Sequence, residues 1–468
     1  MAGLNKYRAY SEYNSTNIEG LVQLPSHWEL KQVRYLLKDG AEGTKIGPFG
    51  SSLKLEDMVD DGVQVYGQEN VIKRDFSLGK RRISFNKFKE MGVYEVFFGD
   101  ILITMMGTSG KCEIVPQTAE KGIIDSHLIR VRVNNKLIIP GFFKLLVDES
   151  PEIKHQIKIQ GKGSIMLGLN SGIIRSLYLP LPSISEQKLI LGFLDYETKK
   201  IDNLIEKQQK LIELLKEKRQ AVISHAVTKG LNPDVPMKDS GVEWLGEVPA
   251  HWIVSGFKKY LSSIVDYRGK TPNKTDDGIL LVTARNIKKG GLDYTLSQEF
   301  IAPSDYKEVM SRGLPDIGDV LFTTEAPLGE VANVDRVDIA LAQRIIKFKG
   351  MTSCLNNYYF KYFIMSSAFQ QSLNLYSSGS TAQGIKAERF VYLKKLLPPI
   401  NEQIEIVDFL DKEISKIDIL VEQQFVMLSL LQERRTALIS AAVTGKIDVR
   451  DWVAPGTQES EEPQEVSA

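Results

Sequence analysis

The chain contains one long amphipathic segment twice, and this duplication constrains its architecture more than any other feature. The first copy covers residues 185–228 and the second covers residues 401–444. Matching residues such as Arg219 and Arg435 lie 216 positions apart (435 minus 219) throughout, with no gap. An ungapped match of this length indicates an internal duplication. A single heptad run would be typical of a dimerisation helix, whereas two equivalent helices in one polypeptide can pair with each other.

Apolar residues in each copy recur alternately three and four positions apart, which is the a/d spacing of a coiled coil. Polar residues interrupt the two seams at matching places, Gln208 and Lys218 in the first copy and Gln424 and Arg434 in the second. Polar residues at such positions cost stability but fix the register and the partner. We therefore predict that the two helices pair with each other. The predicted seam consists of Ile201, Leu204, Leu211, Leu215, Val222, Ile417, Leu420, Met427, Leu431 and Leu438.

The composition is that of an ordinary globular protein. With 468 residues, 43% hydrophobic and 25% charged, the chain is long enough for two or three domains. No run of about 18 apolar residues occurs, and residues 1–6 lack the hydrophobic core of a signal peptide, so we expect a cytoplasmic protein without membrane contact. Cys112 and Cys354 lie in different halves, which favours a reducing compartment. The histidines are not spaced as metal ligands, so no metal site is expected.

Charge alone argues against a nucleic-acid binder. The 59 basic and 59 acidic residues give a formal net charge of zero, whereas phosphate contacts normally leave a basic excess. Part of the acidic share is segregated, however, because residues 448–468 form a glutamate-rich segment that we expect to be a disordered tail. The distribution of charge is therefore more informative than its sum.

A second repeated block opens each half of the chain. Pro25-Ser26-His27-Trp28 recurs as Pro249-Ala250-His251-Trp252. We expect each Trp to anchor a core and each His to be structural, because no nucleophile or carboxylate pair repeats beside the histidines.

Each half also carries a Gly-Asp pair, Gly99-Asp100 and Gly318-Asp319, ahead of an apolar strand. These landmarks predict an α+β (mixed α/β) fold with two pseudo-repeated α/β domains separated by two long helices that form an antiparallel coiled coil. The predicted parts are a flexible arm (1–15), a first domain (16–184), a central helix and linker (185–235), a second domain (236–400), a C-terminal helix (401–447) and the acidic tail (448–468).

Catalytic motifs are missing from the sequence. Gly269-Lys270-Thr271 is not a phosphate loop, because position 264 is Ile where the first Gly should stand and Pro272 would obstruct the following helix. Residues 397–400 lack the polar and aromatic residues of the Asn/Asp-Pro-Pro-aromatic tetrad of amino-methyltransferases. No Gly-x-Gly-x-x-Gly follows a strand, and no nuclease-like metal cluster is apparent. We therefore expect a non-catalytic chain that holds no cofactor.

The parts of the two predicted domains that differ in sequence both contain basic, glycine-bearing loops suited to DNA. Glycines let backbone amides approach phosphate, Lys and Arg neutralise it, and Arg, Asn and Gln can read base edges. Any single cluster would be typical of a solvated basic rim, and only the recurrence in both regions favours DNA. The candidate contact residues are Lys45, Ser51, Ser52, Lys54, Gln68, Asn70, Lys73, Arg74, Arg81 and Arg82 in the first region, and Arg268, Lys270, Thr271, Arg285, Asn286 and Lys288 in the second.

The duplicated helix, the Pro-x-His-Trp entrances, the Gly-Asp strands and the stretches 47–54 and 268–272 together resemble the DNA-specificity subunit of a type I restriction-modification enzyme. The resemblance covers about residues 16–449. It implies that 16–184 and 236–400 are target-recognition domains, each reading one half of a bipartite DNA sequence. It also implies a prokaryotic complex on double-stranded DNA. In such a complex two methyltransferase subunits would bring S-adenosylmethionine, and restriction subunits would use ATP and Mg for translocation and cleavage.

The helix length agrees with such a role, and other functions remain open. The span from Ile201 to Val222 would rise roughly 33 Å, close to the pitch of B-DNA at about 34 Å. Because the two domains differ in sequence, an asymmetric target is expected. A free-standing repressor-like protein would instead bind DNA alone with a steep salt dependence. A DNA-independent coiled-coil adaptor would tolerate charge reversal at residues 80–82, and a fused methyltransferase-nuclease agrees least with the missing motifs.

Overall fold

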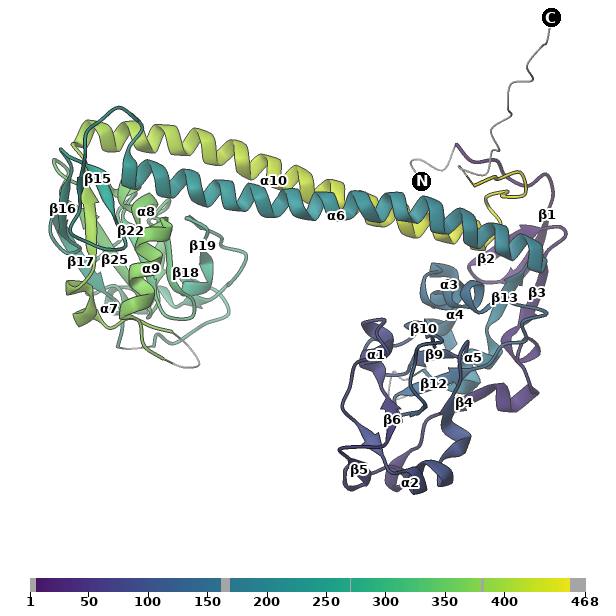
Figure 1. Cartoon of the computed structure of the whole chain (residues 1–468). Coiled ribbons are helices and arrows are strands. Elements are labelled where there is room, and N and C mark those ends of the chain that lie inside the picture. The colour runs from purple at the N-terminus through teal and green to yellow at the C-terminus, as the bar shows by residue number, and fades with distance from the viewer. Residues whose placement is uncertain (1–5, 161–168, 270, 380–382, 455–468) are drawn as a thin grey trace, which may run out of the picture. The chain divides into compact units, whose positions relative to one another are not determined.

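The computed structural model describes residues 6–160, 169–269, 271–379 and 383–454 (Figure 1). The chain divides into two compact units, one comprising Met1–Gln208 with Met427–Ala468 and the other Gln209–Val426. Each unit therefore combines one globular domain with the beginning of the helix that follows it and the end of the other long helix. The candidate residue Lys270 and positions 455–468 of the predicted tail lie outside the described residues.

The two predicted long helices are confirmed as α6 (Ile184–Lys229) and α10 (Ile400–Val443). In the first unit Arg435 Nε of α10 donates to Asp202 Oδ1 of α6 at 2.7 Å. In the second unit Arg219 Nε of α6 donates to Asp418 Oδ1 of α10 at 2.8 Å. These two contacts are related by the same 216-residue repeat, and they require the helices to run in opposite directions within each unit (Figure 1). The antiparallel pairing is thus confirmed.

Part of the predicted seam is displaced by one residue. Ile201 and Ile212 are buried, whereas Leu204 and Leu211 are 45% and 40% exposed. Apolar residues stand side by side at 204–205 and 211–212, so two heptad frames fit the sequence. From Ile201, the predicted frame advances by three residues and then four, whereas the alternative frame advances by four and then three. The frame that forms uses positions 201, 205, 208, 212, 215, 219 and 222.

The second helix shows the same shift. Ile417, Leu431 and Leu438 are buried as predicted, whereas Leu420 and Met427 are exposed. The observed frame of α10 uses positions 417, 421, 424, 428, 431, 435 and 438. This frame is favoured because it brings Arg219 and Arg435 to the helix interface, where each reaches an aspartate of the other helix.

The first domain is built from two main sheets. One has the order β10 (Cys112–Ile114), β9 (Ile101–Thr104), β12 (Leu128–Val131), β4 (Thr44–Ile46), and the other β5 (Met58–Val59), β7 (Arg82–Ile83), β6 (Val63–Tyr66), β11 (Gly122–Ile124), β8 (Glu95–Val96). Two-stranded pairs join β1 (Tyr13–Ile18) to β2 (Leu21–Pro25) and β3 (Glu29–Gln32) to β13 (Tyr178–Leu181). The helices are α1 (Gln68–Ile72), α2 (Phe85–Glu90), α3 (Pro140–Asp148), α4 (Pro151–Gln160) and α5 (Ser171–Ser176).

The second domain repeats this plan with different loops. One sheet has the order β17 (Leu261–Asp266), β25 (Ile345–Gly350), β22 (Val320–Thr324), β23 (Leu328–Asn333), and the other β21 (Phe300–Ile301), β18 (Ile279–Val282), β24 (Ile339–Leu341). Two-stranded pairs join β14 (Met237–Asp239) to β15 (Glu247–Pro249), β16 (Ile253–Gly256) to β26 (Lys394–Leu397), and β19 (Ile287–Lys288) to β20 (Gly291–Leu292). The helices are α7 (Tyr306–Val309), α8 (Asn357–Met365) and α9 (Ser367–Tyr376).

The repeated Gly-Asp pairs close equivalent turns before β9 and β22. Gly99 and Gly318 both adopt a φ of 84°, a left-handed conformation that favours glycine. The Asp100 carboxylate accepts from Arg132 Nε at 2.8 Å, and the buried Asp319 carboxylate accepts from Lys347 Nζ at 2.6 Å. The motif therefore recurs because each turn buries a carboxylate that must be paired with a cation.

Two predicted mobile segments are partly ordered within the first unit. In the predicted arm, Tyr10 is buried and its hydroxyl donates to Glu186 Oε1 at 2.5 Å. At the start of the predicted tail, Val449 is buried and the Trp452 ring lies 5.9 Å from that of Phe193. Composition alone did not reveal this order, because a few aromatic and aliphatic side chains in a polar stretch suffice to anchor it on the core.

Candidate nucleic-acid interface

Three loops of the second domain meet at the carboxyl ends of two parallel strands. β18 and β24 run parallel, with Val282 beside Leu341, so residues 283–286 and 342–344 emerge at the same edge. The loop after β17 reaches this edge as well, because the Tyr267 amide donates to the Ile345 carbonyl at 3.3 Å. We call residues 267–272, 283–286 and 342–344 the second loop edge, of which Lys270 is not described. The loops enclose a hollow of about 210 Å³ whose lining includes Thr271, Arg285, Gln343 and Arg344.

The first domain has an equivalent edge. β6 and β11 run parallel with Tyr66 beside Ile124, so residues 67–70 and 125–127 emerge together. The Gly47 amide donates to the Leu128 carbonyl at 3.0 Å, which brings in the loop after β4. A Cβ atom at Gly47 would lie 1.8 Å from the Asp125 carbonyl oxygen, so this close approach requires glycine. We call residues 47–52, 67–70 and 125–127, together with the Arg81 side chain that donates to Asp125, the first loop edge.

Asn70 and Asn286, both predicted to contact DNA, are instead internal supports of these edges. Both side chains are fully buried. Asn70 Oδ1 accepts from the Gly67 amide at 2.9 Å, and its Nδ2 donates to the carbonyls of Asp75 and Leu78. Asn286 makes the equivalent bonds, accepting from the Thr283 amide at 2.9 Å and donating to two carbonyls. Their donors and acceptors are therefore occupied by backbone, which a sequence pattern cannot distinguish from base recognition.

The predicted basic cluster of the first domain is divided by the strands. Arg81 Nη2 donates to Asp125 Oδ2 at 2.9 Å and lies on the first loop edge. Its neighbour Arg82 points to the amino ends of the parallel strands, where it donates to the Gly62 carbonyl and to Glu120. Arg74 turns toward the carboxylates of Glu113 and Glu149, at 3.6 and 3.7 Å. Only Arg81 of these three belongs to the edge. Arg81 and Arg82 diverge because successive residues of an extended segment point in opposite directions.

Of the other candidates of the first domain, Ser51, Ser52 and Gln68 belong to the edge, whereas Lys45, Lys54 and Lys73 lie outside it. Gln68 Oε1 accepts from the Met106 amide at 3.4 Å. Lys54 Nζ donates to Glu56 at 2.8 Å, and Lys45 Nζ lies 3.7 Å from Glu42 on the strand before the edge. Ser52 and Lys73 are exposed, and Ser51 belongs to the short 3-10 helix Gly50–Ser52 of the edge loop.

In the second domain the structure separates paired from unpaired cations. Arg268 donates to both carboxylate oxygens of Asp266. Burial raises the pKa of that carboxyl, but the hydrogen bonds from Arg268 lower it more, so the pKa lies below its usual value. Arg285 is exposed on the second loop edge and has no hydrogen-bond or ion-pair partner among the described residues. Thr271 is exposed at the hollow, and Lys288 is exposed just beyond the edge on β19.

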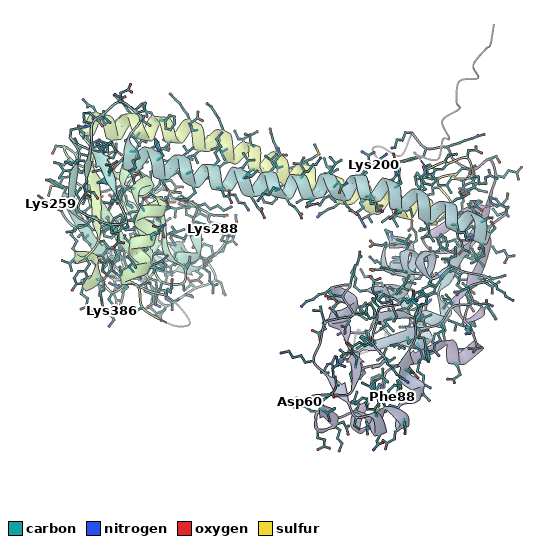
Figure 2. All side chains as sticks on the ribbon, in the orientation of Figure 1. Asp60, Phe88, Lys200, Lys259, Lys288 and Lys386 are labelled. Carbon is teal, nitrogen blue, oxygen red and sulfur yellow. The ribbon has the colours of Figure 1, made fainter. Side chains whose placement is uncertain are left out.

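Basic side chains are not confined to one face of the second domain. Figure 2 shows Lys259 and Lys288 on opposite sides of this domain, with Lys386 at a third position. The loop edge is therefore defined by its architecture rather than by charge density.

Sequence reasoning missed the third loop of each edge. Ser126 and His127 belong to the first edge, and Gln343 and Arg344 occupy the corresponding place in the second. The strands before them, β11 and β24, have three residues each, which is too short for a periodicity signal. Arg344 also adopts a φ of 78°, and no sequence feature predicts a left-handed arginine.

Within the described ranges, no group of three or more His, Cys, Asp or Glu side chains is placed to hold a metal ion. In the same part of the chain, no helix is long and apolar enough to cross a membrane.

The sequence of this chain matches a known protein family over both domains. The model of the type I restriction modification DNA specificity domain matches twice, at residues 64–215 and 261–424. The chain belongs to this family. Each match covers one parallel strand pair and extends into the long helix that follows it. As a member of this family, the chain is a DNA-recognition subunit and not a catalytic one, as the resemblance implied.

Individual relatives extend the match over nearly the whole chain. The type I restriction enzyme MjaVIII specificity subunit of Methanocaldococcus jannaschii is 24% identical over 94% of this chain and 98% of the relative. The type I restriction enzyme EcoKI specificity subunit of Escherichia coli strain K12 is 22% identical over 68% of each chain. A chain from a solved structure of a type I R-M system has a TM-score of 0.66 at 15% identity. The match covers 91% of this specificity chain and 99% of that one. This last likeness supports the fold alone.

Proposed function

We propose that the two loop edges are the DNA-reading surfaces of this specificity subunit, each reading one half of an asymmetric bipartite target in double-stranded DNA. The observation that carries the proposal is that one scaffold is built twice but presents different side chains. The buried Asn70 and Asn286 hold equivalent turns, yet the exposed residue before each is Glu69 in one domain and Arg285 in the other. Different side chains on a common scaffold should read different bases.

Partner subunits would dock on the long helices. The observed heptad frame leaves large apolar side chains exposed outside the seam on both long helices. Exposed large hydrophobic side chains are uncommon on a helix pair unless a partner packs against them. These side chains are Leu204, Leu211 and Leu214 on α6, and Ile419, Leu420, Phe425, Val426, Met427 and Leu430 on α10, each between 40% and 56% exposed.

We assign these exposed side chains to contacts with two methyltransferase subunits, with restriction subunits joining the resulting complex. S-adenosylmethionine, ATP and Mg would then be bound by those subunits. The formal net charge of zero supports this division, because partner subunits would have to share the neutralisation of phosphate.

Methylation mapping tests the reading function. The chain is co-expressed with the methyltransferase subunit of its own system, and the methylated sites of the host genome are compared with those of a host that lacks the chain. We expect a single bipartite motif with an unspecified central gap, present only with the chain. Exchange of residues 38–178 for the corresponding segment of another specificity subunit should change one half of that motif only. A change in both halves would contradict one reader per domain.

Docking is tested separately by co-purification. We expect Leu211→Glu with Leu420→Glu to abolish the association with the methyltransferase subunit, because two buried carboxylates would be unpaired in the interface. The matched control is Glu217→Gln with Glu433→Gln, two exposed helix positions that have no hydrogen-bond or ion-pair partner in the described part of the chain.

Tight sequence-specific DNA binding by the isolated chain, without the methyltransferase subunit, would favour a free-standing DNA-binding protein.

A further inference from the structure

The tips of the two turns on each loop edge occupy equivalent places in the two domains. Glu69 and Arg285 each precede the buried asparagine of their turn. His127 and Arg344 each lie three residues after the last residue of β11 or β24. All four side chains are exposed.

The backbone fixes these tips in the same way in both domains. The Met105 amide donates to the His127 carbonyl at 2.9 Å, and the Thr324 amide donates to the Arg344 carbonyl at 2.9 Å. The Thr324 hydroxyl donates to the same carbonyl at 3.2 Å. The first tip of each domain is fixed by Asn70 or Asn286. The tips are therefore rigid backbone positions that project variable side chains, as a recognition surface requires.

The position of the tips also favours ligand contact. Both turns of each domain follow the carboxyl ends of adjacent parallel strands, where open α/β sheets bind their ligands. In the second domain, Arg285 and Arg344 line the same hollow, together with Gln343. Arg344 Nε lies 2.8 Å from Glu325 Oε1, but both side chains are about half exposed. Such a pair contributes little in water and can be exchanged for a base contact.

We infer that Arg285 and Arg344 are the base-reading residues of the second domain and contact G·C pairs in the major groove. Glu69 and His127 occupy the equivalent base-reading positions of the first domain. A guanidinium has only donors, arranged as a fork that matches the O6 and N7 acceptors of guanine. The Glu69 carboxylate offers acceptors, so it suits the exocyclic amine of cytosine or adenine. This inference rests on the proposed DNA-reading function and adds the residues and the base chemistry of each half-site.

The test uses the complex of the full chain with its methyltransferase subunit and maps methylated sites for single variants. We expect Arg285→Ala and Arg344→Ala each to relax one G·C position of the same half-site. Methylation of the original motif should fall about tenfold, as loss of one good base contact predicts. Glu69→Gln should relax a position in the other half-site only. Arg285→Lys should retain the attraction to phosphate but lose the forked donors of the guanidinium. It should therefore relax base specificity at the same position as Arg285→Ala.

Matched controls come from the opposite ends of the same strands. Arg336 is exposed, pairs with Asp338 and precedes β24, whereas Glu120 pairs with Arg82 and precedes β11. Arg336→Ala and Glu120→Gln should leave the motif unchanged. Retention of the untouched half-site, together with co-purification of the methyltransferase subunit, reports that each variant is folded.

Three outcomes would overturn the inference. The motif could stay unchanged in both arginine variants, the Arg336 control could relax it equally, or the relaxed position could be an A·T pair. In each of these cases the wild-type complex still yields a motif, so the proposed function stands. If the wild-type complex yields no motif that depends on the chain, the proposed function and the inference both fall.

Discussion

The indole N–H of Trp252 donates to Glu402 Oε2 at 2.9 Å, joining the entrance of the second domain to the first turn of α10. In the first domain Trp28 donates to Glu186 Oε1 at 3.0 Å, at the start of α6. The repeated Pro-x-His-Trp block therefore contacts the equivalent glutamates, Glu186 and Glu402, at the start of the two long helices. His27 and His251 lie 3.1 and 2.7 Å from the same carboxylates, which supports the structural role expected for them.

Removal of the Glu186 carboxylate should destabilise the first unit. Its side chain is buried and accepts from Tyr10, Trp28 and His27. Glu186→Ala leaves these donors without an acceptor, so we expect a loss of about 2 to 3 kcal/mol in the free energy of unfolding. Urea denaturation followed by tryptophan fluorescence measures the change. The exposed Glu217→Ala is the control and should stay within about 0.5 kcal/mol of wild type.

Asn286 should matter for stability and not directly for base recognition. Asn286→Ala removes three hydrogen bonds to the backbone in a fully buried site, with an expected cost of about 2 to 3 kcal/mol. Native-state hydrogen exchange should show the loss of protection concentrated in residues 283–297. The exposed neighbour Arg285→Ala should change protection little. Equal stability of both variants would argue against a supporting role for Asn286.

The ion pairs between the long helices should be coupled but weak. Arg219 and Asp418 are partly exposed, so a double-mutant cycle with Arg219→Ala and Asp418→Ala should give a coupling of about 0.3 to 1 kcal/mol that declines with added salt. The cycle of Arg435 and Asp202 serves as an internal replicate. A coupling near zero at low salt in both cycles would remove these pairs as determinants of the helix frame.

Lys395 should make the second domain more stable at high pH. Burial lowers the pKa of Lys395 from 10.5 to about 7, although its Nζ donates to the Phe257 carbonyl at 2.6 Å. Between these two pH values the unfolded chain binds a proton that the folded chain lacks. Stability should therefore rise with pH across this window, by at most about 1.4 kcal/mol per unit, and level off below about pH 7.

Melting temperatures of the wild type and Lys395→Met from pH 6 to pH 10 provide the measurement for this effect. Because Met cannot titrate, the difference between the two proteins should carry the pH dependence of Lys395 alone. Parallel profiles across the window would show that Lys395 stays protonated in the folded chain.

The helices should set the gap of the target. Seven residues inserted between Gln208 and Gln209 in α6, and seven between Val426 and Met427 in α10, preserve both heptad frames. The added rise is about 10 Å, so the central gap should lengthen by up to roughly three base pairs without a change in either half-site. Methylation mapping gives the gap directly. Insertion into one helix only is the control and should abolish methylation, since the antiparallel pairing is then out of register.

At the candidate site, some residues could be found from the sequence and others could not. Arg285 and Arg81 were predicted and lie on the loop edges, because basic residues beside turns are visible in sequence. Asn70 and Asn286 were predicted for DNA and proved to be buried supports, since an asparagine that binds backbone and one that binds adenine look alike in sequence. Arg344 was missed because a three-residue strand leaves no periodic signal.

The sequence by itself determined the duplication, the two long helices and their pairing, because each depends on a repeat that spans many residues. Tertiary structure alone decided which heptad frame forms and which side chains reach the loop edges. Leu204 and Ile205 are equally apolar, so only the approach of α10 selects which of the two is partly buried. Likewise, Arg285 and Arg344 are 59 positions apart (344 minus 285), and only the parallel pairing of β18 with β24 brings them to one hollow.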